Sequence, residues 1–323
     1  MEKLRAFLRR KDIVFSPKRY FIDALAAMAQ GLFCTLLIGT ILDTLGSQFH
    51  IGFLTAAVAT VGKGDAAVHY TVGGICSAMV GPAMAVAIGS ALHAPGMVLF
   101  SLAAVGFATN AMGGAGGPLA VFVVAVVAAE CGKAVSRETK VDILVTPLVT
   151  ALVGIGLARL VAAPIGTGAS YVGRLIMWAT ELQPFLMGII VSVVVGVALT
   201  LPISSAAICS VLGLTGLAGG AAVAGCCAQM VGFAVMSFRE NRWGGLVSQG
   251  LGTSMLQMGN IVRNPRIWLP PTVASAITGP VATCLFRLEM NGAPVNSGMG
   301  TCALCGPIGV WSDWVAPSAQ ALA

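Results

Sequence analysis

Charged residues are scarce in this sequence, and their scarcity bounds the class of protein. Of 323 residues, only 9% are charged and 7% aromatic, whereas 57% are hydrophobic and the mean hydropathy is +0.91. Soluble domains carry about 25% charged residues. A water-soluble chain of this composition would leave much apolar surface in water, so the composition excludes an ordinary soluble protein and predicts a membrane protein.

The sequence also lacks the residue patterns of common soluble enzymes. It has no GxxxxGK[ST] loop, no GxSxG and no HExxH motif. Cys302 and Cys305 have CxxC spacing, but no second pair or nearby histidine completes a metal site. We therefore expect no intrinsic catalysis, no metal and no cofactor, and we interpret the cysteines as small apolar packing residues.

Long apolar runs dominate the chain. A helix needs about 20 residues to cross a bilayer, and the 41 glycines suit closely packed helices. Since no long hydrophilic linker is present, we predict a single all-α, polytopic membrane bundle over residues 1–323. The expected spans are residues 24–45, 71–92, 95–109, 117–132, 143–163, 184–201, 216–236 and 268–287.

Between these runs lie apolar stretches that glycine and proline interrupt. Irregular backbone is tolerated at membrane depth only where protein or a water-filled cavity surrounds it. Broken helices of this kind are typical of transporter binding sites, so we predict re-entrant hairpins; ordinary kinks in a channel or receptor are the alternative. The stretches are residues 51–62, 110–118, 202–214, 243–260 and 296–310.

The N-terminal segment carries most of the net charge of +6. Residues 1–19 hold seven basic and two acidic residues, a balance of +5. Leu4, Phe7 and Leu8 recur at helical spacing, which indicates a short amphipathic helix at a lipid surface. Basic flanks of a first span stay inside the cell, so we predict a cytoplasmic N-terminus. One short basic arm on an apolar chain does not indicate nucleic-acid binding.

Two polar clusters in the N-terminal half are candidates for a binding site. Asp65 and His69 are four residues apart and would share a face in a helix, where they could bind a polar substrate or move a proton. A short solvated loop is the alternative. Asn110 begins a glycine-rich stretch that suits either a re-entrant turn at a ligand or a tight interhelical turn.

The C-terminal half supplies five further candidates. Ser204 and Ser205 follow Pro202, where a new half-helix could present free amides and hydroxyls to a ligand. Helix capping alone is the alternative for these serines. Amide side chains both donate and accept, which suits hydroxyl-rich solutes, although Gln229 could instead connect helices. The amides are Gln229, Gln257 and Asn260.

Several long motifs resemble the second enzyme IIC family of the bacterial phosphotransferase system, which includes the perfringolysin O regulator-like membrane proteins. The similarity runs from about residue 15 to residue 312. It rests on VDILVTPLVT (141–150), LTLPISSAAI (199–208), CCAQMVGFAVMSFREN (226–241), QGLGTSMLQMGNIVRNPRIWLPP (249–271) and GMGTCALCGPIG (298–309).

The resemblance implies a sugar-translocating component of the bacterial inner membrane, a homodimer with re-entrant hairpins and separate IIA and IIB phosphocarrier partners. At most, such a protein is the membrane component of a sugar phosphotransferase. Fructose-type members carry a glutamate in a Gly-Ile-Thr-Glu-Gly-Ala-like loop, where the similar loop here has Ser204 and Ser205. The chain ends at Ala323, where we expect another apolar helix.

Two functions remain open on the sequence. The first is a transporter for a small hydroxylated solute, a sugar or sugar-like compound. The second is a membrane-bound sensor or regulator with an enzyme IIC fold and no transport. Fold analogy alone does not choose between them.

We predict that a cysteine introduced near Arg10 is protected from an impermeant maleimide in intact cells and reacts after permeabilisation. The reason is the +5 balance of residues 1–19, which retains this segment on the cytoplasmic side. Labelling from outside intact cells would contradict the orientation.

Overall fold

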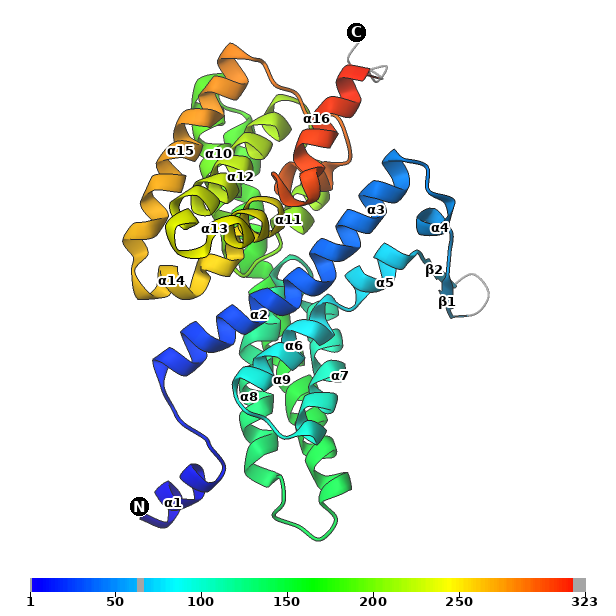
Figure 1. Ribbon diagram of the computed structural model, residues 1–323, viewed down its shortest axis with the longest axis vertical. Coiled ribbons are helices and arrows are strands. Elements are labelled where there is room, and N and C mark those ends of the chain that lie inside the picture. Colours follow the sequence, from blue (N-terminus) through cyan, green and yellow to red (C-terminus); the bar gives the residue numbers. More distant parts are fainter. Residues whose placement is uncertain (1, 63–66, 316–323) are drawn as a thin grey trace. The chain divides into compact units, whose positions relative to one another are not determined.

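The computed structural model describes residues 2–62 and 67–315, and most of them are helical (Figure 1). The helices group into two compact units. The first comprises Met1–Gly113 and Gly117–Ala163, and the second comprises Gly114–Gly116 and Pro164–Ala323. The all-α bundle expected from the sequence is confirmed, whereas the single domain over residues 1–323 stays a prediction.

The first unit contains a nearly continuous N-terminal helix and a group of packed helices. The π-helical turn Arg19–Ala24 leads into α2, and a second one, Phe33–Leu37, connects α2 to α3 without a break. Helix α6 packs against α2, α7 and α8. The bounds are α1 Glu2–Arg10, α2 Leu25–Leu32, α3 Ile38–Gln48, α4 Gly52–Thr55, α5 Val72–Ala78, α6 Val80–Ala91, α7 Gly96–Gly113 and α8 Gly117–Val135.

A short β-hairpin replaces part of an apolar stretch expected to be a broken helix. Strands β1 (Ala59–Val61) and β2 (Val68–Tyr70) pair antiparallel, with Thr60 opposite His69. Residues 59–61 include β-branched Thr60 and Val61, which favour a strand. The re-entrant hairpin predicted over 51–62 is therefore wrong, since α4 and β1 occupy this range.

Helix α9 (Asp142–Thr180) is longer than the span predicted over 143–163. Pro164 removes one backbone hydrogen bond, which predicts an end to the helix, yet the chain continues helically to Thr180. The boundary between the two units falls at this proline, between Ala163 and Pro164. Transmembrane helices tolerate proline because neighbouring groups satisfy the freed carbonyl.

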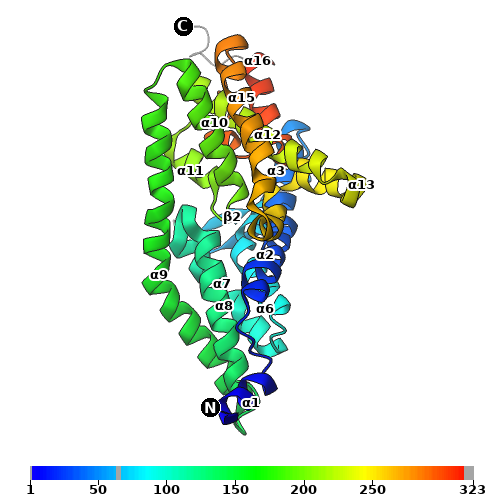
Figure 2. The same cartoon turned by 90° about the vertical axis from the view of Figure 1, so that its left-hand side faces the viewer.

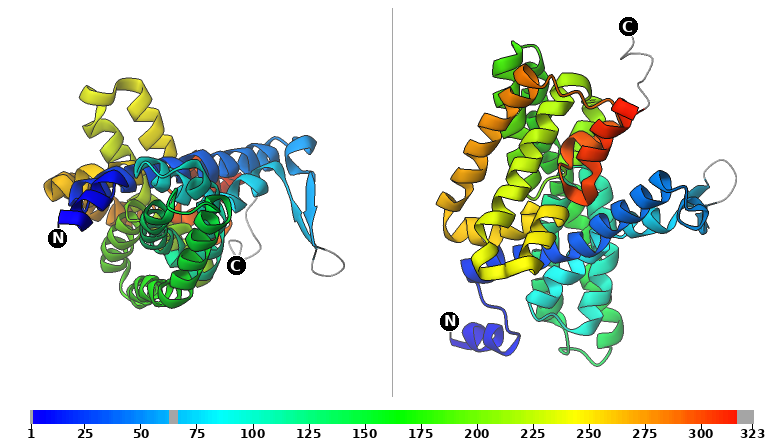
Figure 3. Two further views of the ribbon diagram at one scale, coloured as in Figure 1. Left: turned by 90° about the horizontal axis from the view of Figure 1, so that it is seen from below. Right: turned by 45° about the horizontal axis from the view of Figure 1, so that its top comes forward.

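The second unit is built on a three-helix bundle of α10, α12 and α15, which pack pairwise against one another (Figures 1 and 3). Two broken hairpins, residues 238–263 and 294–315, are attached to it. Helix α13 of the first hairpin projects from the bundle (Figure 2). The bounds are α10 Pro184–Thr200, α11 Ser205–Leu212, α12 Gly216–Met236, α13 Phe238–Val247, α14 Met258–Arg263, α15 Leu269–Pro280 and α16 Cys305–Val315.

Glycines bring the backbones of this bundle into direct contact. A Cβ atom on Gly225 of α12 would overlap the Ser192 carbonyl oxygen of α10, and one on Gly196 would lie 2.8 Å from the Gly225 carbonyl oxygen. A Cβ on Gly279 of α15 would likewise overlap the Gly188 carbonyl oxygen. Small residues at helix interfaces allow this close approach, so the three helices are positioned by backbone contact.

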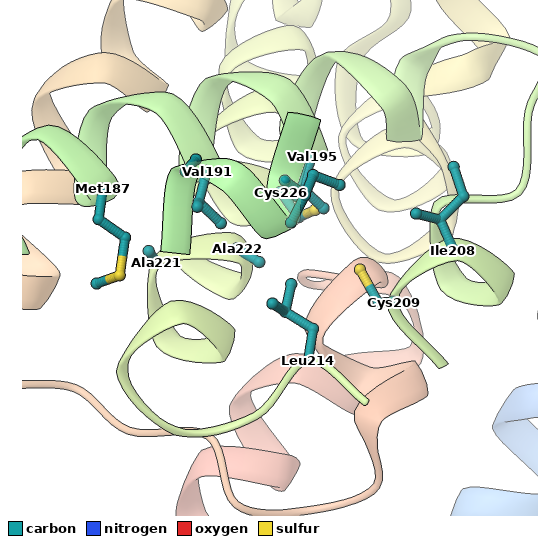
Figure 4. Close-up of a cluster of buried hydrophobic side chains, with 11 residues drawn as sticks. Met187, Val191, Val195, Ile208, Cys209, Leu214, Ala221, Ala222 and Cys226 are labelled. Atoms are coloured by element: carbon teal, nitrogen blue, oxygen red, sulfur yellow. The ribbon is translucent and has the colours of Figure 1, made fainter. Parts of the chain in front are cut away.

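Apolar side chains fill the remaining interior next to α11. Val191 and Val195 of α10 face Ile208, Cys209 and the residues of α12 in one buried cluster (Figure 4). The cluster joins α10, α11 and α12, and it fixes the short helix α11 against the bundle. The small side chains Ala221, Ala222 and Cys226 complete the cluster.

Four helical segments of the described residues are long and apolar enough to cross a membrane: Arg19–Ser47, Gly96–Val135, Asp142–Thr180 and Gly216–Met236. The bent pair α5–α6, with an angle of 50°, makes a fifth if it counts as one span. Helices α7 and α8 pack against each other, so we describe Gly96–Val135 as two helices. Together these features confirm a membrane protein.

We predict that Gly225→Ala lowers the free energy of unfolding by about 1–3 kcal/mol, because overpacking forces the α10 and α12 backbones apart. Gly156→Ala in α9 is the matched control, since a Cβ there meets nothing within 4 Å. The control should retain or raise the melting temperature in detergent. Equal melting temperatures for the two variants would contradict the backbone contact.

Candidate functional site

Of the candidates in the first unit, His69 and Asn110 lie within the described residues and have different surroundings. Asp65 lies outside the described residues. His69 lies on strand β2 with an exposed side chain, and its Nδ1 is 2.9 Å from Thr60 Oγ1. The helix expected to join Asp65 and His69 is therefore wrong at His69, which lies in a strand.

Asn110 occupies a tight packing position in α7. Its side chain contacts Gly81 of α6 and Gly117 of α8 so closely that a Cβ on either glycine would lie within 2.7 Å of it. The chain then turns through Gly114–Gly116, with φ of +50° at Gly114, and continues as α8. The stretch is therefore a tight turn between two helices, and its placement at a ligand stays a prediction.

The two serines after Pro202 have different partners. Ser204 caps α11, because its side chain accepts a hydrogen bond of 3.1 Å from the Ala207 backbone N–H. Ser205 is buried, and its Oγ donates to the Gly298 carbonyl oxygen at 2.7 Å. Ser204 therefore stabilises the start of α11, and Ser205 ties that helix to the second hairpin.

A chain of uncharged hydrogen bonds runs through the first hairpin. Asn260 Nδ2 donates to Gln257 Oε1 at 2.8 Å, and Gln257 Nε2 donates to Gln249 Oε1 at 2.8 Å. Gln249 Nε2 then donates to Ser237 Oγ at 3.0 Å, at the end of α12. Gln249 and Gln257 are buried, whereas Asn260 is exposed. The amides thus lead from the surface of this unit into its interior.

Hydroxyl groups connect the first hairpin to the bundle and the two hairpins to each other. Thr200 Oγ1 of α10 lies 2.9 Å from Ser254 Oγ of the first hairpin, and both residues are fully buried. Thr301 of the second hairpin donates a hydrogen bond to the Gly250 carbonyl oxygen of the first. The turns of both hairpins therefore meet beside α10 and α12.

Gln229 is fully buried in α12, and only one end of its side-chain amide forms a hydrogen bond. Its Nε2 donates to Thr272 Oγ1 at 3.2 Å, and Thr272 Oγ1 donates to the Trp268 carbonyl oxygen at 2.8 Å. Gln229 Oε1 and Trp268 Nε1 are buried and have no hydrogen-bond partner among the described residues. One atom is an acceptor and the other a donor. Since unpaired buried polar groups are costly, they mark a place where a hydroxyl group could bind.

The sequence did not identify every member of this region. Thr272, Ser254 and Thr301 were missed because hydroxyl side chains in apolar helices usually bond to their own backbone. Trp268 was also not among the predicted site residues. The signal available was the density of amides between residues 249 and 260, since amides seldom occur in apolar surroundings without partners.

The arrangement suits recognition of a neutral polar solute. The side chains that form it are amides, hydroxyls and one indole, which supply donors and acceptors without formal charge. Such groups can form hydrogen bonds with the hydroxyl groups of a solute. Small binding sites combine a few convergent polar groups with apolar walls, which matches the bundle around Gln229.

Comparison with protein families decides the relationship. The model of the family described as "Phosphotransferase system, EIIC" matches residues 22–322. The chain belongs to this family. A search of curated proteins and of solved structures finds no match. As an EIIC protein, the chain is a membrane component of a phosphotransferase system, and the resemblance noted in its motifs is confirmed at the level of the family.

Proposed function

We propose that this EIIC protein carries a small hydroxylated solute, a sugar or sugar-like compound, across the bacterial inner membrane, with its N-terminus in the cytoplasm. The observation that carries the proposal is that Gln229 Oε1 and Trp268 Nε1, on two residues that both hydrogen-bond to Thr272, are buried and have no partner among the described residues. A solute hydroxyl can donate to the first atom or accept from the second. The indole ring also offers an apolar surface for the carbon face of a sugar.

The broken hairpins support transport over static binding. The amide chain from Asn260 to Ser237 lies on a hairpin whose backbone changes from helix to π-turn to 3-10 turn between Phe238 and Arg263. Interrupted helices of this kind line the substrate sites of secondary transporters. Their short segments hold the polar groups that a solute exchanges for water.

The proposal includes partners and an assembly. Because the chain belongs to the EIIC family, we propose separate IIA and IIB phosphocarrier proteins as partners and a homodimer as the assembly. Crosslinking in native membranes is expected to yield a dimer. Monomer alone, in membranes and at several detergent concentrations, would contradict the assembly.

We predict that Gln229→Met separates solute binding from stability. Methionine matches the volume of glutamine, and the substitution removes an unpaired buried acceptor, so the melting temperature should stay level or rise. Solute affinity should fall about 5- to 150-fold, which corresponds to about 1–3 kcal/mol for a lost hydrogen bond. A thermal-shift screen of hexoses, pentoses and hexitols first identifies the solute, and calorimetry then gives the affinities.

Ser204→Ala is the matched control for this experiment. Ser204 caps α11, so its loss should lower stability by about 0.5–2 kcal/mol and leave the affinity of the folded protein unchanged. Wild-type affinity in Gln229→Met would place the solute elsewhere. Counterflow of labelled solute in proteoliposomes then distinguishes the two functions, because a sensor binds the solute without exchanging it across the bilayer.

A further inference from the structure

A second polar site lies in the first unit, away from the amides and hydroxyls described above. A cavity of about 500 Å³ opens where the linker after α1, the turn between α6 and α7, and the connection between α8 and α9 meet. Four cationic side chains line it against two carboxylates. They are Arg10, Lys11, Lys133 and Arg137, and Asp12 and Glu138.

The ammonium group of Lys133 is already bonded to neighbouring groups of the protein. Its side chain is buried, and its Nζ donates to the carbonyl oxygens of Asp12 and Leu92, both at 2.8 Å. It also forms an ion pair with Glu130 at 3.0 Å. Leu92 directly follows α6, where carbonyls carry partial negative charge. Lys133 therefore offsets the partial negative charge at the end of α6, and its hydrogen bonds hold one wall of the cavity in place.

The carboxylate of Asp12 is likewise already paired within the protein. Hydrogen bonds from Arg19, with Nη2 at 2.5 Å from Asp12 Oδ2, hold the pKa of this carboxyl well below its usual range. Asp12 is therefore ionised and paired at neutral pH. The cationic side chains left to face a ligand are Arg10, Arg137 and Lys11, whose Nζ also donates to the Ser136 carbonyl oxygen.

Glu138 occupies the position that an anion would take. Its Oε1 lies 2.7 Å from Arg10 Nη2 and 2.6 Å from Lys11 Nζ. The hydrogen bond from Lys11 is the main cause that lowers the pKa of this exposed carboxyl. One carboxylate oxygen shared by two cations shows that both can contact the same anionic oxygen.

Ser136 and Arg137 also supply side-chain donors to the cavity. Ser136 is 3% exposed, and its Oγ has no hydrogen-bond partner among the described residues. The guanidinium of Arg137 forms no hydrogen bond or ion pair with the described part of the chain, and its backbone has a φ of +62°. Strained, non-glycine positions of this kind persist only where the surroundings fix them.

We propose that this cavity binds an anionic phosphate group, which displaces Glu138 from Arg10 and Lys11 and also takes hydrogen bonds from Ser136 and Arg137. Phosphate suits the site because it offers several strong acceptor oxygens and more negative charge than a carboxylate. The phosphate is that of a lipid headgroup or of a soluble phosphate ester. This site is independent of the proposed solute site.

Two variants are expected to change phosphate binding in opposite directions. Glu138→Gln removes the competing carboxylate charge and should tighten binding about tenfold, whereas Arg137→Gln should weaken it about tenfold. Lys140→Gln is the matched control, since it removes the same charge from the same loop but does not line the cavity. Its affinity should stay within about twofold of wild type, and melting temperatures confirm that each variant is folded.

The probes distinguish the sources of phosphate. Glycerol 3-phosphate is titrated by calorimetry, and short-chain phosphatidic acid is compared with short-chain phosphatidylcholine by native mass spectrometry. Binding of both anionic probes, or of either one, with the expected order of variants supports the site and identifies its source. The proposal is overturned if neither probe binds wild type or Glu138→Gln, or if Lys140→Gln weakens binding as much as Arg137→Gln.

Discussion

Direct contact between helix backbones is the constraint on which the second unit depends. Because Gly196, Gly225 and Gly279 lack side chains, carbonyl groups of neighbouring helices lie where Cβ atoms would otherwise be. Because the helices are this close, Ser192 Oγ donates to the Ser275 carbonyl oxygen at 2.7 Å, and Ser275 Oγ donates to the Gly225 carbonyl oxygen at 3.1 Å. The same close packing fixes Gln229 against Thr272, and it therefore sets the geometry of the candidate solute site.

Much of the fold could be predicted because lipid imposes simple rules. Apolar runs gave most of the helices, and glycine and proline marked the broken hairpins over 243–260 and 296–310. Two features could not be predicted. Helix α9 passes through Pro164 because packing and the low dielectric outweigh the loss of one hydrogen bond. The hairpin β1–β2 forms because its β-branched residues favour strands and the two strands pair with each other. Hydropathy alone does not distinguish such strands from a short apolar helix.

The site was less predictable than the fold because a polar residue in an apolar run has several uses. Ser204 caps a helix and Asn110 packs against two glycines, whereas Gln257 connects two other amides. These uses differ only in the partner, and the partner comes from a distant part of the chain. Gln229 Oε1 and Trp268 Nε1 differ from the rest since neither has a partner among the described residues, and no pattern of spacing reveals such an absence.

Backbone contact also has a mechanical consequence. Shear between packed helices requires a layer of side chains that can exchange rotamers as the helices slide, and α10, α12 and α15 have no such layer at their glycine crossings. These three helices therefore behave as one rigid body. Single hydroxyl groups join α10 to the first hairpin at Thr200, α11 to the second hairpin at Ser205, and the two hairpins to each other at Thr301. Movement in this unit is therefore expected in the hairpins, the first of which holds the amides Gln249, Gln257 and Asn260.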